Sequence, residues 1–284
     1  MAKTKISQSQ VNTRELFSVK QILLSRGFEI KTTNTEEKLL VTEPNQDNDI
    51  WKLLFDIYNN SSLRTELKDF LYKRKVPTSN EILMLLNQPC IVKERSRFDN
   101  TFEWYAGELM IRKFAAFSAS HGVTIKDLKR NSNEKESGDF DSLVVLRDTN
   151  LAYFECKAGS FDFNSIRRCY VRMQMLNCQY SILFCVDNID EEKLKWEISK
   201  IKVPGLNLHR MDKINIYGKQ KAYIYELHNC YIIDMSGDVE TKLRTALRIN
   251  AAKINQLHHG IGMDDQTYKE LGYKRETLDV QIYQ

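Results

Sequence analysis

Two short apolar segments, 140–146 and 151–156, stand on either side of a four-residue turn, Arg-Asp-Thr-Asn. Each is the length of a strand, and apolar residues fill consecutive positions, which is typical of strands buried on both faces. A helical pattern at 164–177 and another apolar run at 180–186 follow. Because a helical crossover returns the chain in the same direction, we expect the last strand to lie parallel to its neighbour.

The flanking patterns extend this core in both directions. A helix is expected at 101–119 and a strand at 123–128, which gives the order helix, three strands, helix, strand. Such an order predicts an α/β fold with a mixed central sheet flanked by helices. We expect a core at 98–187, a helix-rich accessory region at 1–92, winged-helix-like in pattern, and an α+β extension at 188–284 that packs on the core.

Within the two flanking regions the elements are expected as follows. Region 1–92 has helical patterns near 16–23, 50–58, 63–72 and 81–86, and strand patterns at 28–32 and 38–42. Region 188–284 has helical patterns at 191–199 and 237–256 and strand patterns at 221–227 and 231–235.

The composition excludes several classes of protein. The chain has 42 Lys and Arg against 38 Asp and Glu, and 42% of its residues are hydrophobic, which is too many for a disordered tail. No apolar run approaches the roughly 20 residues of a membrane-spanning helix. We expect a cytoplasmic protein, since no apolar leader follows the polar start. The six cysteines have no metal-binding spacing and are expected to be reduced core residues.

Charged residues stand at the ends of the two apolar segments. Glu155 and Lys157 are two positions apart, so in a strand they project to one face, about 6 to 7 Å apart. A hairpin would bring Asp141 beside Glu155. These charges could be the solvated face of an amphipathic hairpin, but apolar neighbours such as Phe154 and Cys156 favour a site.

Two carboxylates and one ammonium suit the hydrolysis of a phosphodiester. Carboxylates are hard oxygen ligands for Mg²⁺ or Mn²⁺, and a bound metal lowers the pKa of its water and neutralises charge on the phosphate. A lysine beside the metal can orient the attacking water or stabilise the developing charge. The sequence therefore predicts a metal-dependent nuclease.

The same residues resemble the PD-(D/E)XK nuclease superfamily, which has the restriction-endonuclease-like fold. The phrases Gly-Asp-Phe-Asp, ending at Asp141, and Glu155-Cys-Lys157 are similar to those of Mrr-like restriction nucleases, Holliday-junction resolvases and CRISPR-ancillary nucleases. The resemblance covers residues 98–187 and departs from the nominal motif in having Phe140 before Asp141. It implies that Asp141, Glu155 and the backbone carbonyl of Cys156 hold the metal and that Lys157 assists the water.

The resemblance also implies an acidic metal ligand on the first core helix. Glu103 and Glu108 are the candidates. On a helical wheel Glu103 shares a face with Ala106, Met110, Phe114 and Phe117, whereas Glu108 lies off that face. We therefore expect Glu103 to be the ligand and keep Glu108 as the second choice. Asp139 is interpreted as a turn residue or an outer group.

The helix after the motif is basic. It carries Arg167, Arg168, Arg172 and Gln174, and positions 168 and 172 are one turn apart on one face. These residues are predicted to contact the phosphates of a nucleic acid, with a solvated basic face as the alternative.

We expect an endonuclease that cuts DNA rather than RNA, in restriction or antiviral defence, and that acts as a homodimer because one such site cuts one strand. Two alternatives remain open. One is an inactive nucleic-acid-binding or assembly subunit built on the nuclease fold. The other is an RNA nuclease switched on by a ligand or a protein partner.

Overall fold

The structure is a computed structural model that describes residues 17–32, 46–88, 95–129, 139–147, 150–202, 208, 210–218, 222–258 and 262–281. The predicted strand at 38–42 lies outside these residues. The described helices of the first half are α2 (Val19–Ser25), α3 (Gln46–Asn59), α4 (Ser61–Lys73), α5 (Asn80–Leu86) and α6 (Arg95–Phe114). Those of the second half are α7 (Phe163–Met175), α8 (Glu191–Ser199), α9 (Val239–His258) and α10 (Asp265–Glu270).

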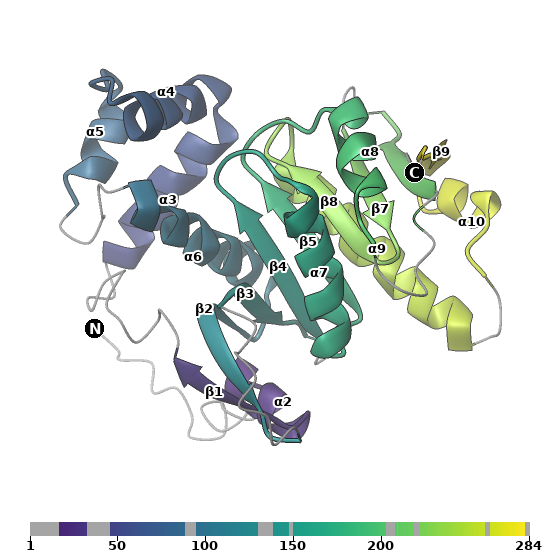
Figure 1. The fold of residues 1–284 in the computed structure, drawn as a ribbon. Helices are drawn as coiled ribbons and strands as arrows, with labels where there is room; N and C mark the ends of the chain where they lie inside the picture. The colour runs from purple at the N-terminus through teal and green to yellow at the C-terminus, as the bar shows by residue number, and fades with distance from the viewer. Residues whose placement is uncertain are drawn as a thin grey trace, which may run out of the picture.

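The strands form one large mixed sheet (Figure 1). They are β1 (Phe28–Thr32), β2 (Ser118–Asp127), β3 (Phe140–Val145), β4 (Leu151–Lys157), β5 (Tyr180–Cys185), β6 (Arg210–Ile216), β7 (Tyr223–Leu227), β8 (Cys230–Asp234) and β9 (Tyr273–Asp279). Their order across the sheet is β1-β2-β3-β4-β5-β8-β7-β6-β9. β5 is parallel to both β4 and β8, and the other neighbours are antiparallel.

Helices cover both faces of the sheet. On one face, Ala106 of α6 and Leu243 of α9 belong to the same core as Phe154 and Phe184 of the central strands. On the other face, α7 and α8 pack on β5 and β8, while α2 packs on β2 and β3. Since apolar side chains alternate between these two cores, β3 and β5 are buried throughout their length and β4 is buried up to Cys156.

Helices α3, α4 and α5 lie near α6, whereas β9 and α10 lie at the other end of the sheet (Figure 1). The ring of Tyr58 in α3 packs against that of Phe102 in α6, with the centroids 5.1 Å apart. Lys68 of α4 forms an ion pair of 2.6 Å with Asp187, just after β5. β1 joins the central sheet through β2, so region 1–92 contributes to the same sheet as the core.

The predicted α/β architecture, a mixed sheet flanked by helices, is confirmed. The order helix, three strands, helix, strand is found in α6, β2, β3, β4, α7 and β5, and β5 enters parallel to β4 as expected. β1, α3, α4, α5, α8, α9, β7 and β8 also correspond to predicted elements.

The predicted end of the first core helix is wrong. α6 ends at Phe114 rather than at residue 119, and Ala115 has a left-handed φ of 54° that breaks the helix. The chain then enters β2 at Ser118, which pairs with Val145. Pairing with a buried strand outweighs the helical pattern here, and Phe117 is therefore not part of the α6 face.

Other elements were missing from the sequence-based expectation. β6 and β9 form the far side of the sheet, and α10 lies between α9 and β9. Both strands carry many charged residues, so their apolar pattern is weak. Within the described part of the chain, no helix combines the length and apolar character needed to cross a membrane. Five of the six cysteines are described, and each is buried and outside a disulfide.

Candidate active site

The register of β3 and β4 aims three predicted site residues at one face of the sheet. Leu143 pairs with Tyr153, and both side chains belong to the core beneath α7. Since side chains alternate along a strand, Asp141, Glu155 and Lys157 point to the same side. Ser142 pairs with Phe154, so Asp141, one residue before it, lies at the end of the ladder opposite Glu155.

These three residues meet around one ammonium group. The Lys157 Nζ lies 2.8 Å from Glu155 Oε1 and 3.7 Å from Asp141 Oδ2. Asp141 Oδ2 also accepts a hydrogen bond of 2.7 Å from the Cys156 backbone N–H. The two carboxylates thus converge on a common point at the ends of adjacent buried strands, which is the grouping that the sequence predicted.

Helix α7 brings two arginines to the same place. Asp162 caps its N-terminus by accepting from the Ser165 N–H, and Ile166, Cys169 and Met173 form the buried stripe that fixes its rotation. This orientation turns Arg168 and Arg172 toward β4.

Arg168 donates from Nε at 3.0 Å and from Nη2 at 2.8 Å to Glu155 Oε1. Arg172 Nη1 lies 3.4 Å from Glu155 Oε2 and 3.9 Å from Asp141 Oδ1. The other two predicted contacts lie elsewhere on α7. Arg167 is exposed, and Gln174 lines a different cavity of about 700 Å³ together with Tyr170 and Lys253.

Tyr153 is a site residue that the sequence reasoning missed. Its fully buried hydroxyl donates to Glu155 Oε2 and accepts a hydrogen bond of 2.7 Å from Arg172 Nη1. The hydroxyl therefore links the helix to the strand. The signal was the alternation of the strand, because positions 153, 155 and 157 share a face.

Burial and neighbouring charges shift the pKa values of the two carboxyl groups in opposite directions. Burial, and after it the charge of Glu155, raises the pKa of Asp141 to about 7. Burial also opposes the ionisation of Glu155, but the charge and hydrogen bond of Lys157, with hydrogen bonds from Tyr153 and Arg168, outweigh it and lower the pKa of that carboxyl. The Glu155 carboxylate is thus ionised at neutral pH, whereas Asp141 loses its proton only as the pH rises through about 7.

The two candidate glutamates of α6 occupy different environments. Glu103 is buried, as are Ala106 and Met110 on the same helical face. α6 covers the Cys156 side of β4, opposite the side of Glu155. The pKa of the Cys156 thiol is raised by burial first and then by carboxylates that include Asp141 and Glu103, so Glu103 lies within electrostatic range of the motif. Glu108 instead accepts a bond of 2.7 Å from Arg112, one turn along the helix.

The oxygen donors at the strand ends suit a hard divalent cation. Mg²⁺ keeps several waters and takes one or two carboxylates from a protein, and the Asp141 and Glu155 carboxylates lie 3.7 and 2.8 Å from the same Lys157 ammonium. The described residues contain no cluster of three or more His, Cys, Asp or Glu side chains that could hold a metal ion. Of the predicted carboxylate ligands, the structure brings Asp141 and Glu155 together, whereas Glu103 lies on α6, which covers the Cys156 side of β4.

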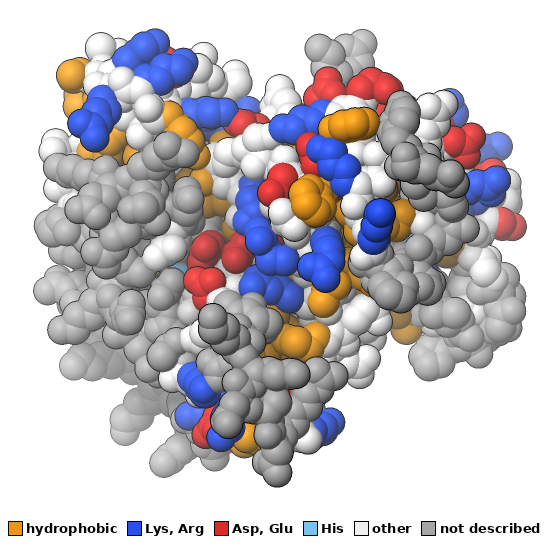
Figure 2. Space-filling view, viewed as in Figure 1, with side chains coloured by type: hydrophobic (Ala, Val, Ile, Leu, Met, Phe, Trp, Pro, Cys, Tyr) orange, Lys and Arg blue, Asp and Glu red, His pale blue; other side chains and the backbone are white. Residues whose placement is uncertain are grey.

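The surface above the site has two charged zones. Figure 2 shows acidic side chains over α6 and β3, and Lys and Arg side chains next to them over β4 and α7. A phosphate that approached this face would meet the basic zone beside the carboxylates. The arrangement suits an anionic substrate and a cation at adjoining positions.

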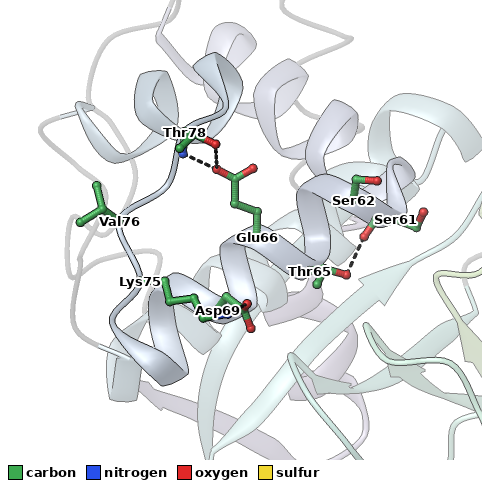
Figure 3. Close-up of a pocket in the computed structure, with 8 residues that line it drawn as sticks. All are labelled: Ser61, Ser62, Thr65, Glu66, Asp69, Lys75, Val76 and Thr78. Carbon is green, nitrogen blue, oxygen red and sulfur yellow. Dashed lines mark hydrogen bonds and ion pairs between the residues drawn. The ribbon is translucent and has the colours of Figure 1, made fainter.

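A cavity of about 470 Å³ lies apart from this site, between α4 and the connector to α5 (Figure 3). Its two carboxylates are engaged within the protein. Glu66 accepts hydrogen bonds from Thr78 and Ser79, and Asp69 is paired with Lys75 at 2.7 Å. These bonds join α4 to α5, and we interpret the cavity as part of that helix packing.

Comparison with known proteins yields only distant structural likeness. No family model matches the chain, and no curated protein matches it. Can2 from Sulfobacillus thermosulfidooxidans, in complex with cyclic tetra-adenylate, is similar over 82% of this chain with 13% identity and a TM-score of 0.42. Protein VC1899 from Vibrio cholerae is similar over 82% of this chain with 11% identity and a TM-score of 0.45. The chain spans 58% and 61% of the lengths of these two structures, and so loose an overlap assigns no function to it.

Proposed function

We propose that this chain is a metal-dependent nuclease that hydrolyses phosphodiester bonds. The observation that carries the proposal is the convergence of Asp141 and Glu155 on the Lys157 ammonium, at 3.7 and 2.8 Å, where two buried strands end. Buried charges are costly unless they are paired, and they concentrate where chemistry needs them. The resemblance of the motif to PD-(D/E)XK nucleases supports the same function.

Each residue has a role that follows from its place. Asp141, Glu155 and the Cys156 carbonyl would hold Mg²⁺ or Mn²⁺, which supplies an acidified water and neutralises phosphate charge when bound. Lys157 would orient the attacking water or stabilise the charge that develops on the phosphate. Arg172, fixed by Tyr153, adds positive charge on the α7 side of the phosphate. Glu103 is the first choice for the further metal ligand on α6, where it would add negative charge, and Glu108 is the second choice.

The proposed substrate is nucleic acid, DNA rather than RNA, and the proposed setting is restriction or antiviral defence. The basic zone over β4 and α7 supports a polyanionic substrate (Figure 2). One site of this kind cuts one strand, so we propose that a homodimer makes a double-strand cut. Light scattering at the working concentration of the enzyme tests the dimer, and a monomer that cuts both strands would contradict it.

A second function is favoured by one specific observation. Both oxygens of Glu155 have protein donors, as in an ion-pair network that only stabilises the fold. The chain would then be a nucleic-acid-binding or assembly subunit. Salt-dependent DNA binding without any Mn²⁺ binding in calorimetry would establish this second function and exclude the first.

Cleavage assays test the main proposal. Plasmid DNA, single-stranded DNA and structured RNA are incubated with the protein in Mn²⁺ and in EDTA. We expect nicking of plasmid that needs the metal and is lost in Glu155→Gln and Lys157→Ala. Lys52→Ala is the control, because Lys52 is an exposed residue of α3 whose ion-pair partner is Asp49. Equal cutting by the parent and the Glu155→Gln protein would refute the proposed site.

A further inference from the structure

The Glu155 carboxylate is surrounded by so many protein donors that it could not bind a metal ion as it stands. Its Oε1 receives Lys157 at 2.8 Å and two N–H groups of Arg168 at 3.0 and 2.8 Å. Its Oε2 receives the Tyr153 hydroxyl and lies 3.4 Å from Arg172. Because a carboxylate oxygen has two lone pairs, the three donors around Oε1 leave no lone pair for a metal ion.

The donors differ in how easily they can leave. Tyr153 and Lys157 are neighbours of Glu155 on β4; Tyr153 is fully buried, and the Lys157 side chain is 22% exposed. The Arg172 side chain is 9% exposed and tied to Tyr153, whereas the Arg168 side chain is 43% exposed. Arg168 is therefore the one that can swing away from Glu155 at small cost, toward water or toward an anion at the surface.

The Arg168 guanidinium can also bind a phosphate in place of Glu155. A guanidinium presents a planar fork of N–H donors that binds phosphate as well as it binds carboxylate. Arg168 belongs to α7, and Figure 2 shows Lys and Arg side chains over that helix, where a substrate backbone would arrive. A phosphate there competes with Glu155 for the same donors.

We propose that Arg168 couples substrate binding to metal binding. In the free protein it holds Glu155 and keeps the carboxylate from a divalent cation. When a phosphate takes the guanidinium, one lone pair of Oε1 is released and the metal affinity rises. By thermodynamic linkage the bound metal raises the affinity for the phosphate by the same factor. This coupling rests on the proposed function. It adds an order of binding, because the metal site is completed only when substrate is present.

Calorimetric titration of Mn²⁺ into the protein without nucleic acid tests the coupling. Arg168→Ala is expected to bind Mn²⁺ about tenfold more tightly than the parent, which is the effect of losing one charge-assisted contact. Arg168→Gln, which keeps the stem but not the charge, should show the same direction. Lys52→Ala, which removes a distant positive charge, should bind like the parent.

A second titration separates competition for Glu155 from a general change of charge. Sodium sulfate serves as a tetrahedral anion that is not hydrolysed, and sodium chloride of equal ionic strength is the reference. Sulfate should tighten Mn²⁺ binding by the parent and should have no such effect on Arg168→Ala.

The outcomes distinguish this inference from the proposed function. If the parent and Arg168→Ala bind Mn²⁺ equally, or if sulfate tightens binding in both, the coupling is refuted while the metal site stands. If no variant binds Mn²⁺ with or without sulfate, the metal site itself is refuted. Circular dichroism of each variant verifies that α7 and the sheet remain folded.

Discussion

Replacing Glu155 by Gln should destabilise the fold as well as abolish activity. The side chain keeps its size but loses the charge that faces Lys157 at 2.8 Å and Arg168 at 2.8 and 3.0 Å. Removing one partner of a buried ion pair costs about 3 to 5 kcal/mol, because the other charge is left without compensation. Since the Arg168 side chain is 43% exposed, water replaces part of its interaction, and we expect about 3 kcal/mol.

Asp141→Asn is the matched comparison. Asp141 lies 3.7 Å from Lys157 and 3.9 Å from Arg172, and an amide oxygen can still accept from the Cys156 N–H. The folded-state pKa of Asp141 is raised to about 7 from 3.8, so its contribution to stability falls as the pH rises through 7. At pH 8 the Asn variant should therefore cost less than about 1 kcal/mol, or stabilise the protein.

Urea unfolding at pH 8, followed by circular dichroism, measures both changes as free energies of unfolding. Both variants should fail to nick plasmid, so only their stability separates them. If Glu155→Gln unfolds within about 1 kcal/mol of the parent, or if Asp141→Asn loses as much as Glu155→Gln, the short contacts of Glu155 do not carry the energy assigned to them.

Three further predictions concern other residues. Tyr153→Phe should cost about 1 to 3 kcal/mol and slow cleavage with little change in KM, because two buried charged groups each lose a partner; equal turnover of the variant and the parent in steady-state assays would contradict this. Glu103→Gln should weaken Mn²⁺ binding in calorimetry while Glu108→Gln leaves it unchanged, and the reverse result would make Glu108 the ligand. Hydrogen bonds from Ser79 and Thr78 lower the pKa of Glu66 to about 2 from 4.5, so acid titration of urea stability should show a loss between those two values that Glu66→Gln lacks.

Much of the core could be predicted because its strands are strongly apolar. β3, β4 and β5 are buried on both faces, and their hydrophobic runs end close to where the strands end. The turn between β3 and β4 and the alternation of side chains were enough to predict that Asp141, Glu155 and Lys157 meet. Local rules determine such features, so they can be derived from a single segment.

Features that depend on distant pairing could not be predicted. α6 ends at Phe114 because the following residues pair with β3, and the helical pattern of the segment gives no sign of that competition. β9 is an edge strand with many charges, and it pairs with β6 across a long stretch of sequence, as for Asp212 and Thr277, which are 65 residues apart. The role of Tyr153 also required the rotation of α7, which places Arg172 within 2.7 Å of its hydroxyl.

The sequence by itself determined the order of the core elements and the side of β4 on which the charged motif lies. These follow from the period of two in a strand and from the apolar runs, which act over a few residues. Only the tertiary structure decided which charges are partners. Arg168 and Arg172 are 13 and 17 residues from Glu155, and their contacts depend on how α7 packs on the sheet. The pKa values of Asp141 and Glu155 diverge for the same reason, since burial and neighbouring charge exist only in the folded chain.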